Sequence, residues 1–388
     1  MAIEWIGADA PTAGHLTARL DLARRATAQY PDAPAAWYAL AEICSLTQDF
    51  ADVIVASARA VELAPPTGRQ LAAYAKALIA SGRFEDALGA LERFAPSPPG
   101  LPLRALRGEA LRRLERLAEA RADFDAALEA DPRDVTAGRG LSLMLTDQGA
   151  WQDLLDVVAG LEAHGALSMT LQLGKARALR RLGRRAETRA LFDFDRVGRV
   201  RTIETPEGFA SLSGFNAQLV AELESPLHSR LSDRPRLRLV GGAQIEDLAA
   251  SEGPALRALF AAVRAAVDRY FDDGRSAPKR ASLVPWALVL GPDDFQARHY
   301  HVEAALAGVY YVAAPAEILE EGCVRGALVI PDSPADLEGG DSPVRHIQPQ
   351  PGRLVLFPGY LPHRTLPTGK PGQRISIAFN VVSSDQPA

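Results

Sequence analysis

The sequence predicts a multidomain protein of α and β structure, with paired α-helices over residues 1–193 and a β-strand barrel with flanking helices over residues 194–388. Three observations support this division. The length of 388 residues suits about two domains. Turn-forming positions recur at a fixed interval in the first half. From about Phe194 onward, Val, Ile, Pro, Gly and aromatic residues increase, and apolar residues begin to alternate as in strands.

The composition excludes several classes of protein. A net charge of −5 argues against a protein dominated by contacts to nucleic-acid phosphates. No apolar run approaches the roughly 18 residues of a membrane span, and the N-terminus lacks the pattern of a signal peptide. Cys44 and Cys323 lie in different halves, which excludes a disulfide scaffold. We therefore expect a cytoplasmic protein without nucleic-acid or membrane partners, and the abundance of Arg and Ala over Lys suggests a GC-rich bacterial genome.

The helical half repeats with a step of 33 or 34 residues. The step is read from turn-like positions, which are Asp49, Gly82, Glu115, Gly149 and Gly183. In the clearest block, which starts at Leu101, small residues would let two helices approach while Phe124 fills the space between them, and Pro132 would end the second helix. Residues 14–193 resemble the tetratricopeptide repeat family in this period and pattern. An unrelated helical bundle is the alternative.

The resemblance to tetratricopeptide repeats implies a solenoid whose concave surface binds a protein or peptide partner. The array could instead only pack against the second half of the chain or form a dimer, because a fold does not by itself settle a function.

The strand-rich half contains a candidate metal site. His301 and Glu303 have the spacing at which two side chains of a strand point to the same side. Such a triplet occurs by chance about once in this sequence, so it needs a third ligand to carry weight. His363 follows a buried strand and a Pro/Gly turn that would present it. Two His and one carboxylate form the facial triad of non-haem Fe(II) oxygenases.

A basic residue follows the distal histidine at a suggestive distance. Arg374 lies 11 residues after His363 and opens the alternating run 374–380. Arg374, Ser376 and Asn380 would share one face of this strand, and the apolar residues between them would share the other. An arginine that points into a barrel needs an anionic partner.

Residues from about 200 to 382 resemble the 2-oxoglutarate–Fe(II) oxygenase superfamily, and within it the bacterial oxygenases that are often fused to tetratricopeptide repeats. The resemblance is carried by seven short stretches taken in order: 213–216, 241–244, 299–301, 308–311, 352–358, His363 and 374–380. It implies a double-stranded β-helix, or jelly-roll, fold.

The same resemblance implies site residues and cofactors. Fe(II) would be held by His301, Glu303 and His363, and 2-oxoglutarate by Arg374. Two further residues would contact 2-oxoglutarate, namely Ser376 and Tyr311.

The sequence departs from the superfamily at one ligand position. Most members have Asp in the triplet, where this chain has Glu303. Glu303 is either a ligand or a bystander, and His299 is accordingly a metal ligand or a residue that lines the site. The leading hypothesis is a dioxygenase that uses O₂ and 2-oxoglutarate to hydroxylate a partner recruited by the helices. The alternatives are an adaptor with a degenerate, inactive barrel and a cupin-type metalloenzyme that uses another divalent metal.

Overall fold

The computed structural model describes residues 3–6, 13–46, 49–94, 101–164, 169–224, 239–246, 248–251, 253–273, 277–301, 304–331 and 344–383. The described residues form two compact units. Residues 13–164 make up the helical unit. Residues 3–6 and the described residues from 169 onward make up the strand-containing unit, which we call the barrel unit.

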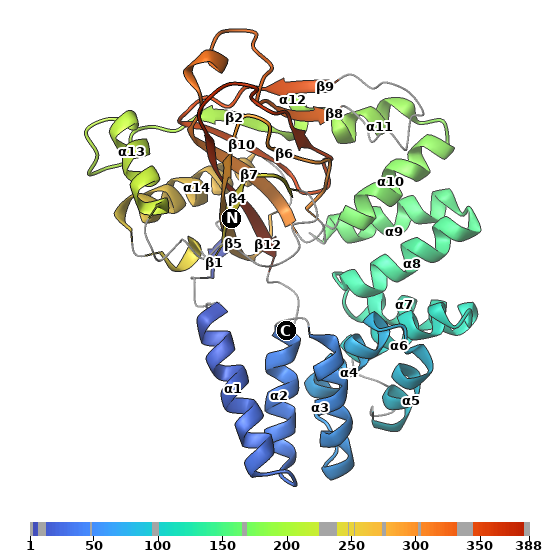
Figure 1. The fold of residues 1–388 in the computed structure, drawn as a ribbon. Coiled ribbons are helices and arrows are strands. Elements are labelled where there is room, and N and C mark those ends of the chain that lie inside the picture. The colour runs from blue at the N-terminus through green and yellow to red at the C-terminus, as the bar shows by residue number, and fades with distance from the viewer. Residues whose placement is uncertain are drawn as a thin grey trace. The chain divides into compact units, whose positions relative to one another are not determined.

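The helical unit consists of one leading helix and four helix pairs (Figure 1). The helices are α1 (Ala13–Gln29), α2 (Pro34–Leu46), α3 (Phe50–Leu63), α4 (Gly68–Ala80), α5 (Phe84–Phe94), α6 (Leu101–Arg113), α7 (Leu117–Ala130), α8 (Val135–Gln148) and α9 (Trp151–Ala163). A fifth pair, α10 (Met169–Arg181) and α11 (Arg185–Phe192), belongs to the barrel unit. The predicted repeat is confirmed, because the first helices of the five pairs begin 33 or 34 residues apart.

The turns inside the pairs lie where the sequence places them. Gly82, Gly149 and Gly183 follow the first helix of a pair, with φ angles of 75°, 69° and 74°. Glu115 occupies the equivalent turn with φ 61°, which is uncommon for a residue other than glycine. The left-handed conformation ends one helix and turns the chain into the next.

The helices pack closely because small residues meet one large one. Phe124 of α7 is fully buried, and its ring lies where side chains of Gly108 and Gly140 would otherwise be. A Cβ added at Gly140 would lie 2.2 Å from this ring. Beside it, Arg107 donates two hydrogen bonds of 2.7 Å to Asp123 and neutralises this buried carboxylate.

The barrel unit is built around a seven-stranded sheet. Its path runs β1 (Glu4–Trp5), β5 (Arg280–Leu290), β12 (Arg374–Ser383), β7 (Ala304–Ala313), β10 (Arg353–Pro358) and β2 (Arg199–Thr202), and β4 (Ala243–Ile245) also pairs with β5. A second sheet has the order β11 (Arg364–Thr365), β8 (Leu328–Pro331) and β9 (Val344–Ile347). The strands β3 (Leu239–Val240) and β6 (Phe295–Gln296) form a third. These curled sheets form the double-stranded β-helix that the sequence predicts.

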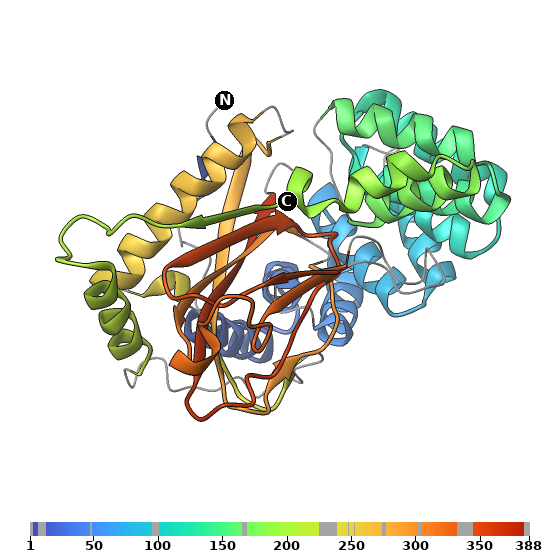
Figure 2. The ribbon, with the colours of Figure 1, turned by 90° about the horizontal axis from the view of Figure 1, so that it is seen from above.

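Two helices cover the outer face of the large sheet. They are α13 (Leu212–Leu223) and α14 (Pro254–Asp272), and Figure 2 shows α14 lying along the strands. Ile377 and Phe379 of β12 point into the core that these helices close, together with Tyr310 of β7. Tyr310 donates a 2.6 Å hydrogen bond to Asn216 of α13. The alternation predicted for β12 therefore holds, and its other residues are left to face inward.

The division into units differs from the predicted boundary at residues 193 and 194. Phe192 and Phe194 are buried in one cluster with Val355 and Phe357 of β10, so α10, α11 and the short α12 (Phe194–Val197) pack as part of the barrel unit. The Tyr360 hydroxyl fixes this packing by donating a 2.9 Å hydrogen bond to the carbonyl oxygen of Leu191.

The N-terminal strand also belongs to the barrel unit, although the sequence suggests that it precedes the helices as part of their domain. Glu4 and Trp5 of β1 pair in parallel with Arg280 and Ala281 of β5. Ile3 is buried in the core beneath α14, and the Trp5 indole donates a 3.2 Å hydrogen bond to Asp268 of that helix.

Candidate metal and 2-oxoglutarate site

Three histidines meet at one end of the barrel interior. They are His299, His301 and His363, and their candidate ligand atoms all lie within 4.8 Å of one another. His299 and His363 are paired across the barrel by two backbone hydrogen bonds, of 2.9 Å and 3.0 Å. Directly opposed residues of an antiparallel pair point to the same side, and so does His301, two residues after His299.

Hydrogen bonds fix the tautomers of two of these rings. Nδ1 of His299 donates to the carbonyl oxygen of Ala297 at 2.8 Å, and Nδ1 of His363 donates to that of Leu361 at 3.0 Å. A carbonyl oxygen can only accept, so the proton lies on Nδ1 and the lone pair on Nε2. Nε2 of His363 lies 3.1 Å from Nε2 of His301.

Burial keeps the imidazoles neutral. Removal from water lowers the pKa of His301 to about 3, with a smaller contribution from His299. Burial, and then the neighbouring histidines, lower the pKa of His363 well below its usual value. Neutral imidazole is the form that binds a metal, so protons compete little for these nitrogens near neutral pH.

A glycine that the sequence analysis did not single out positions His301. The backbone N–H of His301 donates a 3.0 Å hydrogen bond to the carbonyl oxygen of Gly359. A Cβ on Gly359 would lie 2.2 Å from the carbonyl oxygen of Ala304 and 2.7 Å from that of His301. Only glycine lets the turn after β10 approach the chain this closely.

The other predicted ligand, Glu303, lies outside the described residues. The structure therefore brings together two of the three predicted ligands and adds His299 to them. The signal for His299 was present in the sequence as a second histidine at strand spacing from His301.

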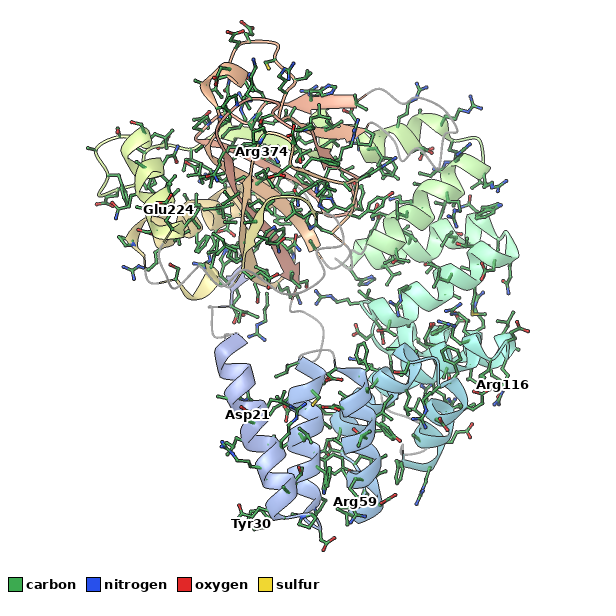
Figure 3. All side chains as sticks on the ribbon, viewed as in Figure 1. Asp21, Tyr30, Arg59, Arg116, Glu224 and Arg374 are labelled. Carbon is green, nitrogen blue, oxygen red and sulfur yellow. The ribbon has the colours of Figure 1, made fainter. Side chains whose placement is uncertain are left out.

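Arg374 lies deep inside the barrel unit, where Figure 3 shows it among the strands. Its side chain is 1% exposed. Nη1 donates a 2.5 Å hydrogen bond to the carbonyl oxygen of Gly326, and Nη2 donates one of 3.1 Å to the hydroxyl of Thr365. Nε has no hydrogen-bond partner. Burial lowers the pKa of the guanidinium, which means that its charge is poorly compensated.

The remaining predicted residues lie close to Arg374. Ser376 is buried two residues further along β12 and is paired with Tyr311 of β7. The Tyr311 hydroxyl is buried and has no hydrogen-bond partner, and burial raises the pKa of Tyr311 to about 12. The phenol is therefore protonated at neutral pH and has an O–H to donate.

One cavity joins the histidines to Arg374. Its volume is about 410 Å³, a figure that includes the part open to solvent. Its wall is formed by residues of β5, β7, β8, β10 and β12 and of the segments around the histidines, namely Trp286, Leu288, Gln296, His299, His301, Gly308, Val309, Tyr311, Leu328, Phe357, His363, Thr365, Arg374, Ser376 and Ala378. No described residue of this wall is acidic.

These features fit a metal ion and a dicarboxylate together. The imidazole nitrogens supply metal ligands at one end of the cavity. At the other end, a buried guanidinium with an unpaired N–H and a protonated phenol await an anion, since an unpaired buried charge is costly. The keto acid group of 2-oxoglutarate would suit the first end and its far carboxylate the second.

Fold and site together define a metal-dependent, 2-oxoglutarate-binding β-helix domain. Residues 285–380 match the sequence model of the family described as "Putative 2OG-Fe(II) oxygenase". Fe(II) and 2-oxoglutarate are the cofactors that this family implies, and the histidine cluster fits an iron site. The chain thus joins a helical array of the tetratricopeptide type to a domain of the 2-oxoglutarate–Fe(II) oxygenase type.

Several solved structures are similar to parts of the chain. A prolyl-4-hydroxylase from Pseudomonas putida is 17% identical, with 49% of this chain and 95% of that chain covered and a TM-score of 0.36. A tetratricopeptide repeat protein from Parabacteroides merdae is 19% identical, with 46% and 72% covered and a TM-score of 0.40. A prolyl hydroxylase from Trichoplax adhaerens, solved with a fragment of hypoxia inducible factor, is 17% identical, with 55% and 96% covered and a TM-score of 0.36.

No curated protein matches the chain. None of the helices in the described ranges is both long enough and apolar enough to pass through a bilayer.

Proposed function

We propose that this protein is an Fe(II)- and 2-oxoglutarate-dependent dioxygenase that hydroxylates a protein or peptide. The observation that carries the proposal is Arg374, a buried cation without an acidic neighbour in the described cavity wall, placed in the same cavity as three neutral histidines. A cupin that binds only a metal has no use for such an arginine.

Each group of the cavity has a part in this function. Arg374 and Thr365 would hold the far carboxylate of 2-oxoglutarate, with the Tyr311 hydroxyl donating a further hydrogen bond. The histidine Nε2 atoms would hold the metal. When bound, Fe(II) supplies the oxidation of substrate by O₂ that is coupled to conversion of 2-oxoglutarate to succinate and CO₂. The apolar wall around Val309, Leu328 and Phe357 would keep bulk water from this end of the cavity.

The open end of the cavity supports a substrate outside the barrel. Trp286 lies there with its ring centroid 5.8 Å from that of His301, and its side chain is partly exposed. Val284, its neighbour on the same face of β5, is 47% exposed. A partly open apolar edge beside the metal position suits a side chain presented by a peptide.

The helical array supplies the second part of the proposal. Stacked helix pairs of this type form extended surfaces that bind peptide segments. We infer that the helical unit recruits the substrate or a partner that carries it. A reducing cytoplasmic setting belongs to the same proposal, and Cys44 and Cys323 form no disulfide, as it requires.

The test is a titration of the metal-free protein with Fe(II) and 2-oxoglutarate without oxygen, followed by admission of air. We expect a weak visible charge-transfer band that saturates at one equivalent, and then succinate formation that a peptide substrate accelerates. Mass spectrometry should find that peptide heavier by one oxygen atom. Binding without any succinate would instead favour the adaptor hypothesis, and absence of the band would favour a metal site that does not use 2-oxoglutarate.

A further inference from the structure

We propose that His299 is the third protein ligand of the metal, so that the centre has three neutral imidazoles and Glu303 is not a ligand. The inference rests on the proposed function only for the identity of the metal, since it concerns which side chains bind any divalent ion at this place.

The backbone places His299 as firmly as the other two histidines. His299 and His363 exchange both backbone hydrogen bonds, and their ring centroids are 4.2 Å apart. The ring centroids of His299 and His301 are 5.2 Å apart. Two residues of one strand and the residue opposite the first therefore present three rings to one point. His299 is 8% exposed, which is close to the 4% of His363.

His299 and His363 are also oriented by the same device. In each case Nδ1 donates to the carbonyl oxygen of the residue two positions earlier, Ala297 or Leu361. Hydrogen bonds of this kind hold a metal-binding histidine in the tautomer whose Nε2 is free for the metal. A histidine that merely lined the cavity would have no need of the orientation that its ligand neighbour has.

The distances fit an octahedral ion. Two nitrogens that are each about 2.1 Å from a metal lie about 3.0 Å apart at a right angle and about 3.4 Å apart at a tetrahedral angle. The observed separation of 3.1 Å between Nε2 of His301 and Nε2 of His363 matches the right angle. The limit of 4.8 Å that encloses all three ligand atoms leaves a small inward movement for the remaining contacts.

A consequence follows for charge. Three imidazoles leave the full double positive charge on the ion, whereas a carboxylate would reduce it by one. Together with Arg374, the cavity would then carry more positive charge than a site with two His and one carboxylate. This excess favours a doubly charged anion such as 2-oxoglutarate.

The experiment compares His299→Ala with Glu303→Gln in the full chain. Apo protein is titrated with Co(II) by calorimetry and by its visible absorption bands, without 2-oxoglutarate or turnover. His346→Ala, which removes an exposed histidine of β9, is the control for loss of an imidazole elsewhere. We expect His299→Ala to weaken Co(II) binding by at least about tenfold, because even residues that only orient a ligand cost about that much when lost.

The outcomes separate the two ligands. Glu303→Gln and His346→Ala should bind Co(II) as the natural protein does. His299→Asp should restore much of the affinity with changed absorption bands, because a carboxylate is also a good ligand, and this variant decides the matter if His299→Ala does not fold. Loss of Co(II) affinity in Glu303→Gln, alone or together with His299→Ala, would overturn the proposal, as would unchanged affinity in both variants.

This test is independent of the proposed function. Loss of Co(II) affinity confined to His299→Ala, in a protein that never consumes 2-oxoglutarate, would refute the oxygenase and leave the three-histidine centre intact.

Discussion

Replacement of Arg374 by alanine should abolish most of the affinity for 2-oxoglutarate and leave metal binding intact. The guanidinium is 1% exposed, and it has hydrogen bonds to Gly326 and Thr365 but no acidic partner among the described residues that line the cavity. A ligand carboxylate would therefore be its neutralising partner. Two unit charges about 4 Å apart attract each other by about 4 kcal/mol at an effective dielectric constant of about 20.

This value lies inside the range of about 2–5 kcal/mol measured when one partner of a buried, hydrogen-bonded charge pair is removed. The dissociation constant of 2-oxoglutarate should accordingly rise by about 30-fold to a few thousand-fold. The assay is anaerobic titration of the Fe(II) protein, followed by the charge-transfer band or by calorimetry. Arg201→Ala, which removes an exposed arginine of β2, is the matched control and should leave the affinity unchanged.

A second measurement separates loss of binding from loss of folding. Arg374→Met should be no less stable than the natural protein without ligand, because it replaces a poorly compensated buried charge by an apolar side chain of similar length. The natural protein should gain about 2.7 kcal/mol at a 2-oxoglutarate concentration 100 times its dissociation constant, and the variant should gain almost nothing. Undiminished affinity in a folded Arg374→Ala variant would refute the argument and favour the metallo-cupin.

Three further outcomes are expected. Tyr311→Phe, which removes an unpaired buried hydroxyl, should weaken 2-oxoglutarate by about 0.5–1.5 kcal/mol in the same titration and should not lower the stability of the ligand-free protein. Gly140→Ala should destabilise the helical unit by about 1–3 kcal/mol in thermal unfolding because its Cβ would overlap an aromatic ring, whereas Gly89→Ala, which meets nothing within 4 Å, should stabilise α5 by about 0.5–1 kcal/mol. Acid should destabilise the metal-free protein: His301, with a pKa near 3 when folded and about 6.5 when unfolded, binds fewer protons when folded, so unfolding measured from pH 7 to pH 5 should show a loss of about 2 kcal/mol that His301→Gln no longer shows.

The sequence predicted the features that depend on local periodicity. The alternation in 374–380 correctly placed Arg374 inside the barrel and Ile377 outside it, because side chains of a strand alternate by geometry. The 33- and 34-residue steps correctly located Gly82 and Gly149, since a repeat fixes its own turns.

Features that depend on distant pairing escaped the sequence analysis. The weight of His299 comes from its backbone pairing with His363, 64 residues away, and spacing along one strand does not reveal it. Gly359 looks like an ordinary turn residue until the chain at His301 is seen to pass against it. The domain boundary shifted because Phe192 and Phe194 are equally compatible with a helix pair and with burial against strands.

The two-residue strand β1 has a consequence for how this protein can be divided. Glu4 and Trp5 occupy the edge of β5 at Arg280 and Ala281, with backbone hydrogen bonds of 2.8 Å and 2.9 Å from Glu4 and Ile6. The helical unit is therefore an insertion between two segments of the barrel unit. A fragment that begins after the helices would lose the partner of this edge and expose backbone groups able to pair with another chain. Such a fragment should aggregate, whereas one in which a short linker replaces the helices behind residues 3–6 should remain monomeric.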